Sequence, residues 1–281
     1  MIEPLLASFA VLVTVLSSVL GLAVGSFLNV VVYRVPLGMS VVTPPSSCPR
    51  CGAAITSRDN IPVLSWVLLA GKCRSCRTAI SVRYPLVEAG TGAAFVAVTL
   101  DLISDEPTSG RGITSGLLVL GAYLYLAAVS IALALIDVDV HRLPNLIVLP
   151  GYVVGTVLLS LAALSSGDLG PLLRAGIGLA AMWFAYFLMA IVYSGGMGFG
   201  DVKLAGVLGL FLGYLGWGEL AVGSFAAFLL GGFYAVGLLV ARRATRKSGI
   251  PFGPWMLAGA WVGIFFGDRV WDGYLTLLGA V

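Results

Sequence analysis

Long apolar stretches alternate with short polar segments along most of this 281-residue chain. A helix that crosses the hydrocarbon core of a bilayer needs about 20 consecutive, mostly apolar residues. Stretches of about that length lie near residues 5–33, 86–100, 116–136, 146–164, 172–193, 203–217, 220–241 and 254–279. The second and sixth are short, so their ends are the least defined. The pattern predicts an all-α polytopic membrane protein with about eight transmembrane helices.

The composition agrees with this pattern. Hydrophobic residues make up 59% of the chain and charged residues only 10%, with a mean hydropathy of +1.03. A typical soluble domain is about 25% charged, so these few charges exclude a soluble globular enzyme. The high hydrophobicity excludes a disordered chain. The net charge of +3 is too small to indicate a nucleic-acid partner.

The basic residues predict an orientation, because cytoplasmic loops carry an excess of Lys and Arg. With eight spans, thirteen of the sixteen basic residues share one side: Arg34, Arg50, Arg58, Lys72, Arg74, Arg77, Arg83, Arg142, Lys203, Arg242, Arg243, Arg246 and Lys247. The opposite side has Arg111, Arg174 and Arg269, with the acids Glu3, Asp101, Asp105, Glu106, Asp168, Glu219, Asp268 and Asp272. We therefore expect a multi-pass membrane protein with the basic side in the cytoplasm and both termini outside.

One extended polar segment, residues 34–85, interrupts the spans, and its prolines indicate a loop-rich insert. All four cysteines lie in it, as Cys48-x2-Cys51 and Cys73-x2-Cys76. Two such knuckles can present four thiolates in a tetrahedron to a structural Zn²⁺. Two disulfides are the alternative, but they need an oxidising compartment, whereas the insert is predicted to be cytoplasmic. The insert is also too small to bury a useful core unaided, which favours zinc.

Carboxylates at the ends of two predicted spans are the second candidate site, because a carboxylate in a membrane helix is costly and is often functional. Asp137 and Asp139 end the third span, and Asp201 precedes the sixth on the same side. An acid in the last turn of a helix opposes the helix dipole. Glycines around Asp201, including Gly198 and Gly200, would let an extended peptide approach the carboxylate.

Structural interpretations of these acids stay open at this point. Asp201 could be a helix N-cap, and Asp137 or Asp139 could pair with Arg142 or Lys203. If the acids meet, they share one proton, so that one activates a water while the other donates to the scissile carbonyl, as in aspartic proteolysis. The chain has no HExxH and no GxSxG motif. Its single histidine, His141, cannot form a metal site alone.

Several motifs, in order, resemble the bacterial type IV prepilin peptidases, membrane aspartic proteases of the GxGD class. They begin with Gly25–Pro36 (GSFLNVVVYRVP), the paired Cys-x2-Cys knuckles and Arg83–Glu88 (RYPLVE). Asp137 with Leu143-Pro144, Gly198–Lys203 (GFGDVK) and Pro251–Pro254 (PFGP) complete the set. The resemblance covers residues 25–275.

The resemblance implies removal of a short basic leader from type IV prepilins or pseudopilins, which serve pili or type II secretion. The cut is cytoplasmic, after a Gly, and is often followed by N-methylation with S-adenosylmethionine. The catalytic pair maps onto Asp137 and Asp201, and Asp139 tunes the dyad or binds the leader. The zinc insert accompanies methyltransferase activity, to which Gly71 and Lys72 are linked. The partners implied are the prepilin and the lipid bilayer, without nucleic acid.

The resemblance divides the chain into a first transmembrane helix (1–33), a tetra-cysteine zinc domain (34–85) and a seven-helix peptidase domain (86–281). Two other functions remain to be distinguished. A presenilin-like protease would also use an Asp with GxGD, but it would lack the cysteine insert. A proton-coupled transporter would place its acids at mid-membrane and often shows an internal repeat, which this sequence does not.

Overall fold

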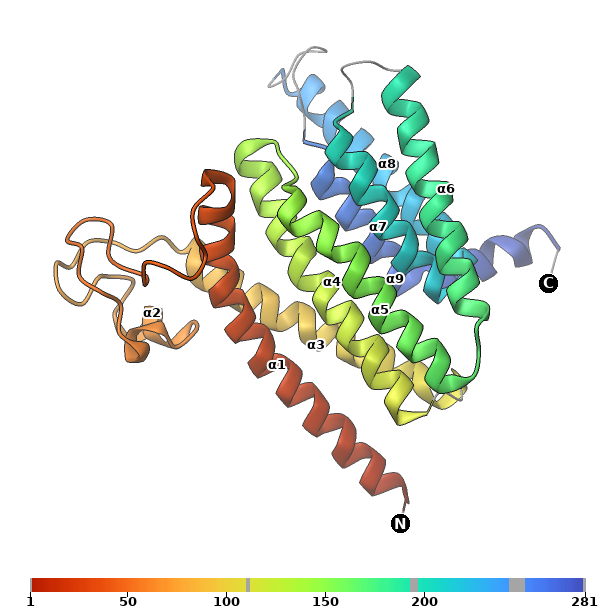
Figure 1. The fold of residues 1–281 in the computed structure, drawn as a ribbon, viewed down its shortest axis with the longest axis horizontal. Coiled ribbons are helices and arrows are strands. Elements are labelled where there is room, and N and C mark those ends of the chain that lie inside the picture. The colour runs from red at the N-terminus through yellow and green to blue at the C-terminus, as the bar shows by residue number, and fades with distance from the viewer. Residues whose placement is uncertain (1, 110–111, 193–196, 243–250, 280–281) are drawn as a thin grey trace. The chain divides into compact units, whose positions relative to one another are not determined.

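The structure is a computed structural model that describes residues 2–109, 112–192, 197–242 and 251–279 (Figure 1). Eight long helices are described: α1 (Ile2–Arg34), α3 (Arg83–Ser109), α4 (Ile113–Val140), α5 (Asn145–Ser166), α6 (Gly170–Val192), α7 (Phe199–Leu215), α8 (Trp217–Val240) and α9 (Gly253–Leu277). The segment between α1 and α3 has only the 3-10 turns Val35–Leu37 and Ser57–Asn60 and the short helix α2 (Leu64–Leu68).

Each long helix corresponds to one predicted span, and six of them are long and apolar enough to cross a membrane: α1, α3, α4, α5, α6 and α8. The all-α membrane class is therefore confirmed. Helix α7, at 17 residues, lies at the lower end of the length that a span needs. Helix α9 carries Asp268, Arg269 and Asp272 in its second half. For α7 and α9, membrane crossing stays a prediction.

The chain forms two compact units: Met1–Gly110 with Tyr123–Ala132, and Arg111–Ala122 with Leu133–Val281. The predicted divisions at residues 33 and 85 stay a prediction. Of the charges that support the predicted orientation, Arg111, Arg243, Arg246 and Lys247 lie outside the described residues.

In the first unit, α1 and α3 pack closely because glycines leave room for backbone contact. A Cβ on Gly25 would lie 2.7 Å from Cα of Glu88, and one on Gly21 would lie 2.9 Å from Cα of Gly92. Polar side chains of the motif Gly25–Pro36 in α1 donate hydrogen bonds to backbone carbonyls of later segments. The Asn29 side-chain amide donates to the Tyr84 carbonyl (3.2 Å). The Arg34 guanidinium, buried at the end of α1, donates to the carbonyls of Ser40 and Pro44.

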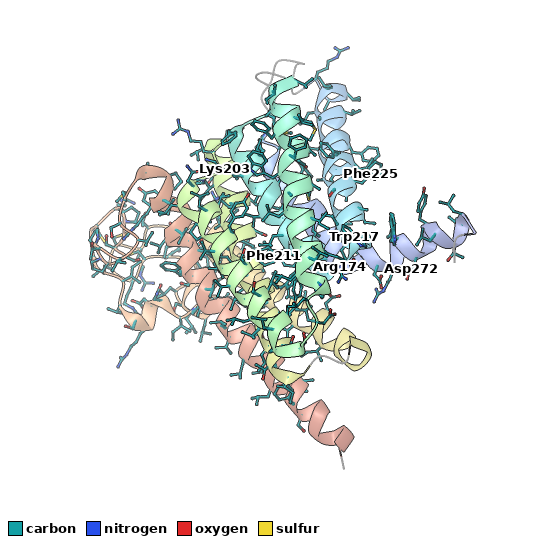
Figure 2. The ribbon with its side chains drawn as sticks, turned by 45° about the vertical axis from the view of Figure 1, so that its right-hand side comes forward. Arg174, Lys203, Phe211, Trp217, Phe225 and Asp272 are labelled. Carbon is teal, nitrogen blue, oxygen red and sulfur yellow. The ribbon has the colours of Figure 1, made fainter. Side chains whose placement is uncertain are left out.

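In the second unit, α7 is the central helix, packed against α5, α6, α8 and α9 (Figure 1). Every residue from Val202 to Tyr214 is buried except Lys203. Figure 2 shows Lys203 and Arg174 near opposite ends of α7, with Phe211 between them. Arg174 of α6 donates to the carbonyls of Tyr214 and Leu215, which the end of α7 leaves without helical partners.

Glycines set the distance between α6 and α7. A Cβ on Gly178 of α6 would overlap the Gly209 carbonyl oxygen of α7, and a Cβ on Gly213 would lie 2.6 Å from the Arg174 carbonyl oxygen. Helices in membranes associate through such small residues, because lipid removes the hydrophobic drive between them.

The α6–α7 contact predicts that alanine at two glycine positions of α6 affects stability differently. We expect Gly178→Ala to lower the free energy of unfolding by about 1–3 kcal/mol, because the new methyl forces the two backbones apart. Thermal unfolding in detergent measures this. Gly176→Ala is the control, because a Cβ there meets nothing within 4 Å. Equal stability of both variants would contradict the close packing.

Candidate active site and metal centre

Asp137 lies in the last turn of α4, as the sequence predicts, and is buried. The helix ends at Val140, and the C-cap residue His141 adopts a left-handed conformation (φ 54°). The His141 N–H donates to the Asp137 carbonyl (2.9 Å). The Asp137 carboxylate turns to α9, where the Gly253 N–H donates to its Oδ2 (3.1 Å). A Cβ at residue 253 would lie 2.6 Å from this oxygen, so only glycine fits the contact.

Gly253 is the first residue of α9, so the positive end of the α9 dipole faces the Asp137 carboxylate. This explains how an acid tolerates the unfavourable end of α4. The sequence pattern assigns no site role to Gly253, although this residue lies in the PFGP motif. The available signal is a glycine directly after a Pro-Phe turn and before a helix.

Asp201 lies in the first turn of α7, and Gly198 is the N-cap residue. The Gly198 N–H donates to Asp201 Oδ2 (3.1 Å), while the Asp201 N–H donates to the Gly198 carbonyl (3.0 Å). Asp201 is therefore not the N-cap itself but the N3 residue, whose carboxylate reaches back to the N-cap N–H as in one half of a capping box. Capping occupies one of its two carboxylate oxygens and leaves the other for a further partner.

The fold brings Asp137 and Asp201 to one end of the second unit, where both border residues that contact Leu143. Leu143, in the loop after α4, lies against the starts of α7 and α9. A Cβ on Gly200 would lie 3.1 Å from Leu143 Cβ, and one on Gly253 would lie 3.2 Å from Leu143 Cδ2. Gly200 thus makes room for Leu143, and Gly198 is exposed.

The ion-pair interpretation is wrong for Asp137, which forms no salt bridge with any described residue, and it stays open for Asp139. The Lys203 ammonium donates to the Asn145 side chain (2.9 Å) and lies 5.0 Å from the centre of the Phe199 ring. Asp139 is exposed at the end of α4. Two carboxyl groups within hydrogen-bonding reach of each other share one proton, and this arrangement activates water for peptide hydrolysis.

The four cysteines of the insert come together, with their Sγ atoms all within 4.8 Å of one another. All four are free thiols, and the Sγ atoms of Cys48 and Cys76 lie 3.8 Å apart. Four sulfurs held about 2.3 Å from a tetrahedral zinc would be separated by about 3.8 Å. The cluster is therefore able to bind a metal ion, and a thiolate set selects zinc over the harder Mg²⁺ or Ca²⁺.

The two knuckles have the same backbone construction. The Cys48 N–H donates to the Ala53 carbonyl and the Cys73 N–H to the Thr78 carbonyl, with a left-handed residue closing each turn, Gly52 or Arg77. Backbone N–H groups of Cys51 and, next, of Arg50 lower the pKa of the Cys48 thiol to about 6. The thiolate that metal binding needs is thus stabilised by backbone donors.

An ion pair joins Arg74 of the second knuckle to Asp59 of the 3-10 turn Ser57–Asn60. Arg74 donates from Nε to both carboxylate oxygens of Asp59 (2.9 Å each) and from Nη2 to Oδ1 (2.5 Å). The Arg74 guanidinium lowers the pKa of the Asp59 carboxyl, first through these hydrogen bonds and then through its charge.

Gly71 and Lys72 precede the second knuckle. Gly71 has a φ of +66°, and a Cβ there would lie 2.8 Å from the Trp66 ring. The Trp66 indole N–H donates to the Ile80 carbonyl (3.1 Å), and Lys72 is exposed. Packing alone therefore requires glycine at residue 71, because the turn and the Trp66 ring leave no room for a side chain.

Two family profiles match the chain: Bacterial Peptidase A24 N-terminal domain over residues 19–102, and Type IV leader peptidase family over residues 124–236. The curated relatives include three proteins called prepilin leader peptidase/N-methyltransferase. The protein of Aeromonas salmonicida (strain A449) is 34% identical over 92% of each chain. The protein of Pseudomonas aeruginosa is 35% identical over 98% of this chain and 97% of its own, and that of Neisseria gonorrhoeae 35% over 91% of each. No solved structure matches.

The cysteine cluster predicts that the purified protein contains zinc. We expect the purified protein to hold about one zinc ion per chain and to lose it when Cys48 and Cys73 are both changed to Ser, because two of four ligands are removed. Metal analysis by inductively coupled plasma mass spectrometry measures this. Ser75→Ala, an exposed change between the ligands Cys73 and Cys76, is the control and should keep the zinc. A metal-free wild-type protein would contradict the site.

Proposed function

We propose, because this chain belongs to the type IV leader peptidase family, that it is a membrane aspartic endopeptidase that removes the leader peptide of type IV prepilins or pseudopilins. The observation that carries the proposal is that Leu143 packs against both Gly200, next to Asp201, and Gly253, whose N–H at the N-terminus of α9 binds Asp137. The catalytic role of this pair is part of the proposal.

The chemistry follows from two carboxyl groups that hold one proton between them. The ionised carboxylate takes a proton from a water molecule, whose oxygen attacks the carbonyl carbon of the scissile peptide. The protonated carboxyl gives its proton to the carbonyl oxygen, and the tetrahedral intermediate collapses when the leaving amine is protonated. No metal ion is required, because the two acids together supply base and acid.

The site suits a basic leader that arrives from the cytoplasm. Asp139 adds an exposed negative charge two residues after Asp137. Three basic residues lie on the side of the two acids, as expected for a cytoplasmic face. They are Arg142 after the end of α4, Lys203 near the start of α7 and Arg242 after the end of α8. The apolar N-terminal helix of a pilin would then lie in the lipid while its leader reaches the acids.

We also propose that the protein N-methylates the new amino terminus with S-adenosylmethionine. The support is the name of the relatives, which join both activities, and the cysteine insert with Gly71 and Lys72. The tight turn at Gly71 presents Lys72 at the surface beside the knuckle, where a cation can attract the carboxylate of the methyl donor.

Cleavage tests the acid pair. We expect Asp137→Asn and Asp201→Asn to abolish leader removal from a co-expressed prepilin, because neither variant can hold the shared proton. Immunoblotting of the pilin reports cleavage, and that of the enzyme reports its level in the membrane. Asp272→Asn, near the other end of α9, is the control and should cleave normally (Figure 2). Full cleavage by either site variant would disprove the assignment.

Methylation is tested separately on the same substrate. Mass spectrometry of the processed pilin should show the loss of the leader and a gain of about 14 Da for one methyl group. We expect Lys72→Ala to reduce the methylated fraction while cleavage continues, because Lys72 is outside the unit that holds both acids. Normal methylation by this variant would remove Lys72 from the proposed cofactor site.

A further inference from the structure

Tyr186 of α6 lies opposite Asp201 of α7. The two helices run antiparallel, and two backbone contacts fix their register: Arg174 meets Gly213, and Gly178 meets Gly209. Each step of four residues along α6 therefore corresponds to four residues back along α7. Two further steps from Gly178 reach Tyr186 on α6 and Asp201 on α7.

The Tyr186 hydroxyl is buried without a hydrogen-bond partner among the described residues, and the side chain is only 2% exposed. Such a group is uncommon, because a buried polar atom loses its water without gaining another partner. The orphaned donor lies beside a carboxylate that uses one oxygen for its own helix cap. A water molecule held between the two would give the hydroxyl an acceptor and the free carboxylate oxygen a donor.

Aromatic contacts hold the Tyr186 ring in place. Its centre lies 5.6 Å from that of Phe228 and 6.4 Å from that of Phe252, and these two rings lie 5.4 Å apart. Phe252 immediately precedes Gly253, whose N–H binds Asp137. The same cluster therefore borders both acids, and phenylalanine at residue 186 would keep its contacts.

We propose that Tyr186 is a third catalytic residue, whose hydroxyl donates a hydrogen bond to the nucleophilic water bound at Asp201. This inference rests on the proposed peptidase function. Tyr186 keeps its proton throughout. The water transfers one proton to a carboxylate, and its oxygen forms the bond to the carbonyl carbon, so the hydroxyl orients the oxygen lone pair without joining the proton transfer.

The test compares two tyrosine-to-phenylalanine changes in purified enzyme. We expect Tyr186→Phe to lower kcat by about 10- to 100-fold with little change in KM, because one hydrogen bond to the reacting water is lost. Tyr152→Phe is the matched control, since the Tyr152 hydroxyl donates to the Lys203 carbonyl (2.6 Å) at the same helix. It should keep kcat but melt at a lower temperature, whereas Tyr186→Phe should melt at the wild-type temperature or above.

A second measurement distinguishes a bound water from a structural role. A peptide inhibitor built on the cleavage sequence, with a hydroxyl group in place of the attacking water, should bind Tyr186→Phe about tenfold more weakly than wild type. An unchanged kcat, unchanged inhibitor affinity or a lower melting temperature for Tyr186→Phe would each overturn the proposal while wild-type cleavage stands. If the wild-type enzyme cleaves no prepilin, the proposed function fails and this inference fails with it.

Discussion

The buried contact between the Asp137 carboxylate and the N-terminus of α9 is the constraint on which the site depends. A carboxylate removed from water costs several kcal/mol, and the C-terminal end of α4 adds an unfavourable dipole. The Gly253 N–H and the positive end of α9 offset both effects. Because a Cβ at residue 253 would meet the carboxylate, the start of α9 must be a glycine, and the end of α4 must approach it within hydrogen-bonding distance.

The second acid depends on a different kind of interaction, the packing of α7 inside its unit. Helices α6 and α7 approach until backbone meets backbone at Gly178 and Gly209. Helices α8 and α9 approach in the same way, where a Cβ on Gly263 would lie 2.7 Å from Cα of Gly223. Such contacts allow few alternative positions, since a shift along either helix would bring side chains against backbone. The position of Asp201 at the start of α7 is therefore set by glycines far along the helix from the acid itself.

The cysteine insert is built on local interactions within the first unit. The knuckles close through their own backbone hydrogen bonds, and the Asp59–Arg74 pair joins the second knuckle to the turn before α2. A buried carboxylate again makes the connection to a long helix, because Glu88 of α3 accepts the Val63 N–H (2.6 Å). Val63 has a φ of +60°, which is unfavourable for a β-branched residue, so this bond holds the insert in a conformation that the local sequence would not select.

The sequence alone determined the eight long helices, the four-cysteine cluster and the three acids at the ends of two spans, because apolar length, Cys-x2-Cys spacing and the rarity of carboxylates in lipid are local properties. Only the tertiary structure decided which groups meet these residues. The Gly253 N–H comes from 116 residues after Asp137. An antiparallel register that glycines at 178, 209 and 213 create places Tyr186 opposite Asp201. A tyrosine in an apolar helix has no pattern that distinguishes a core residue from a site residue, since the difference lies in whether its hydroxyl finds a partner, and that depends on the packing of helices distant in sequence.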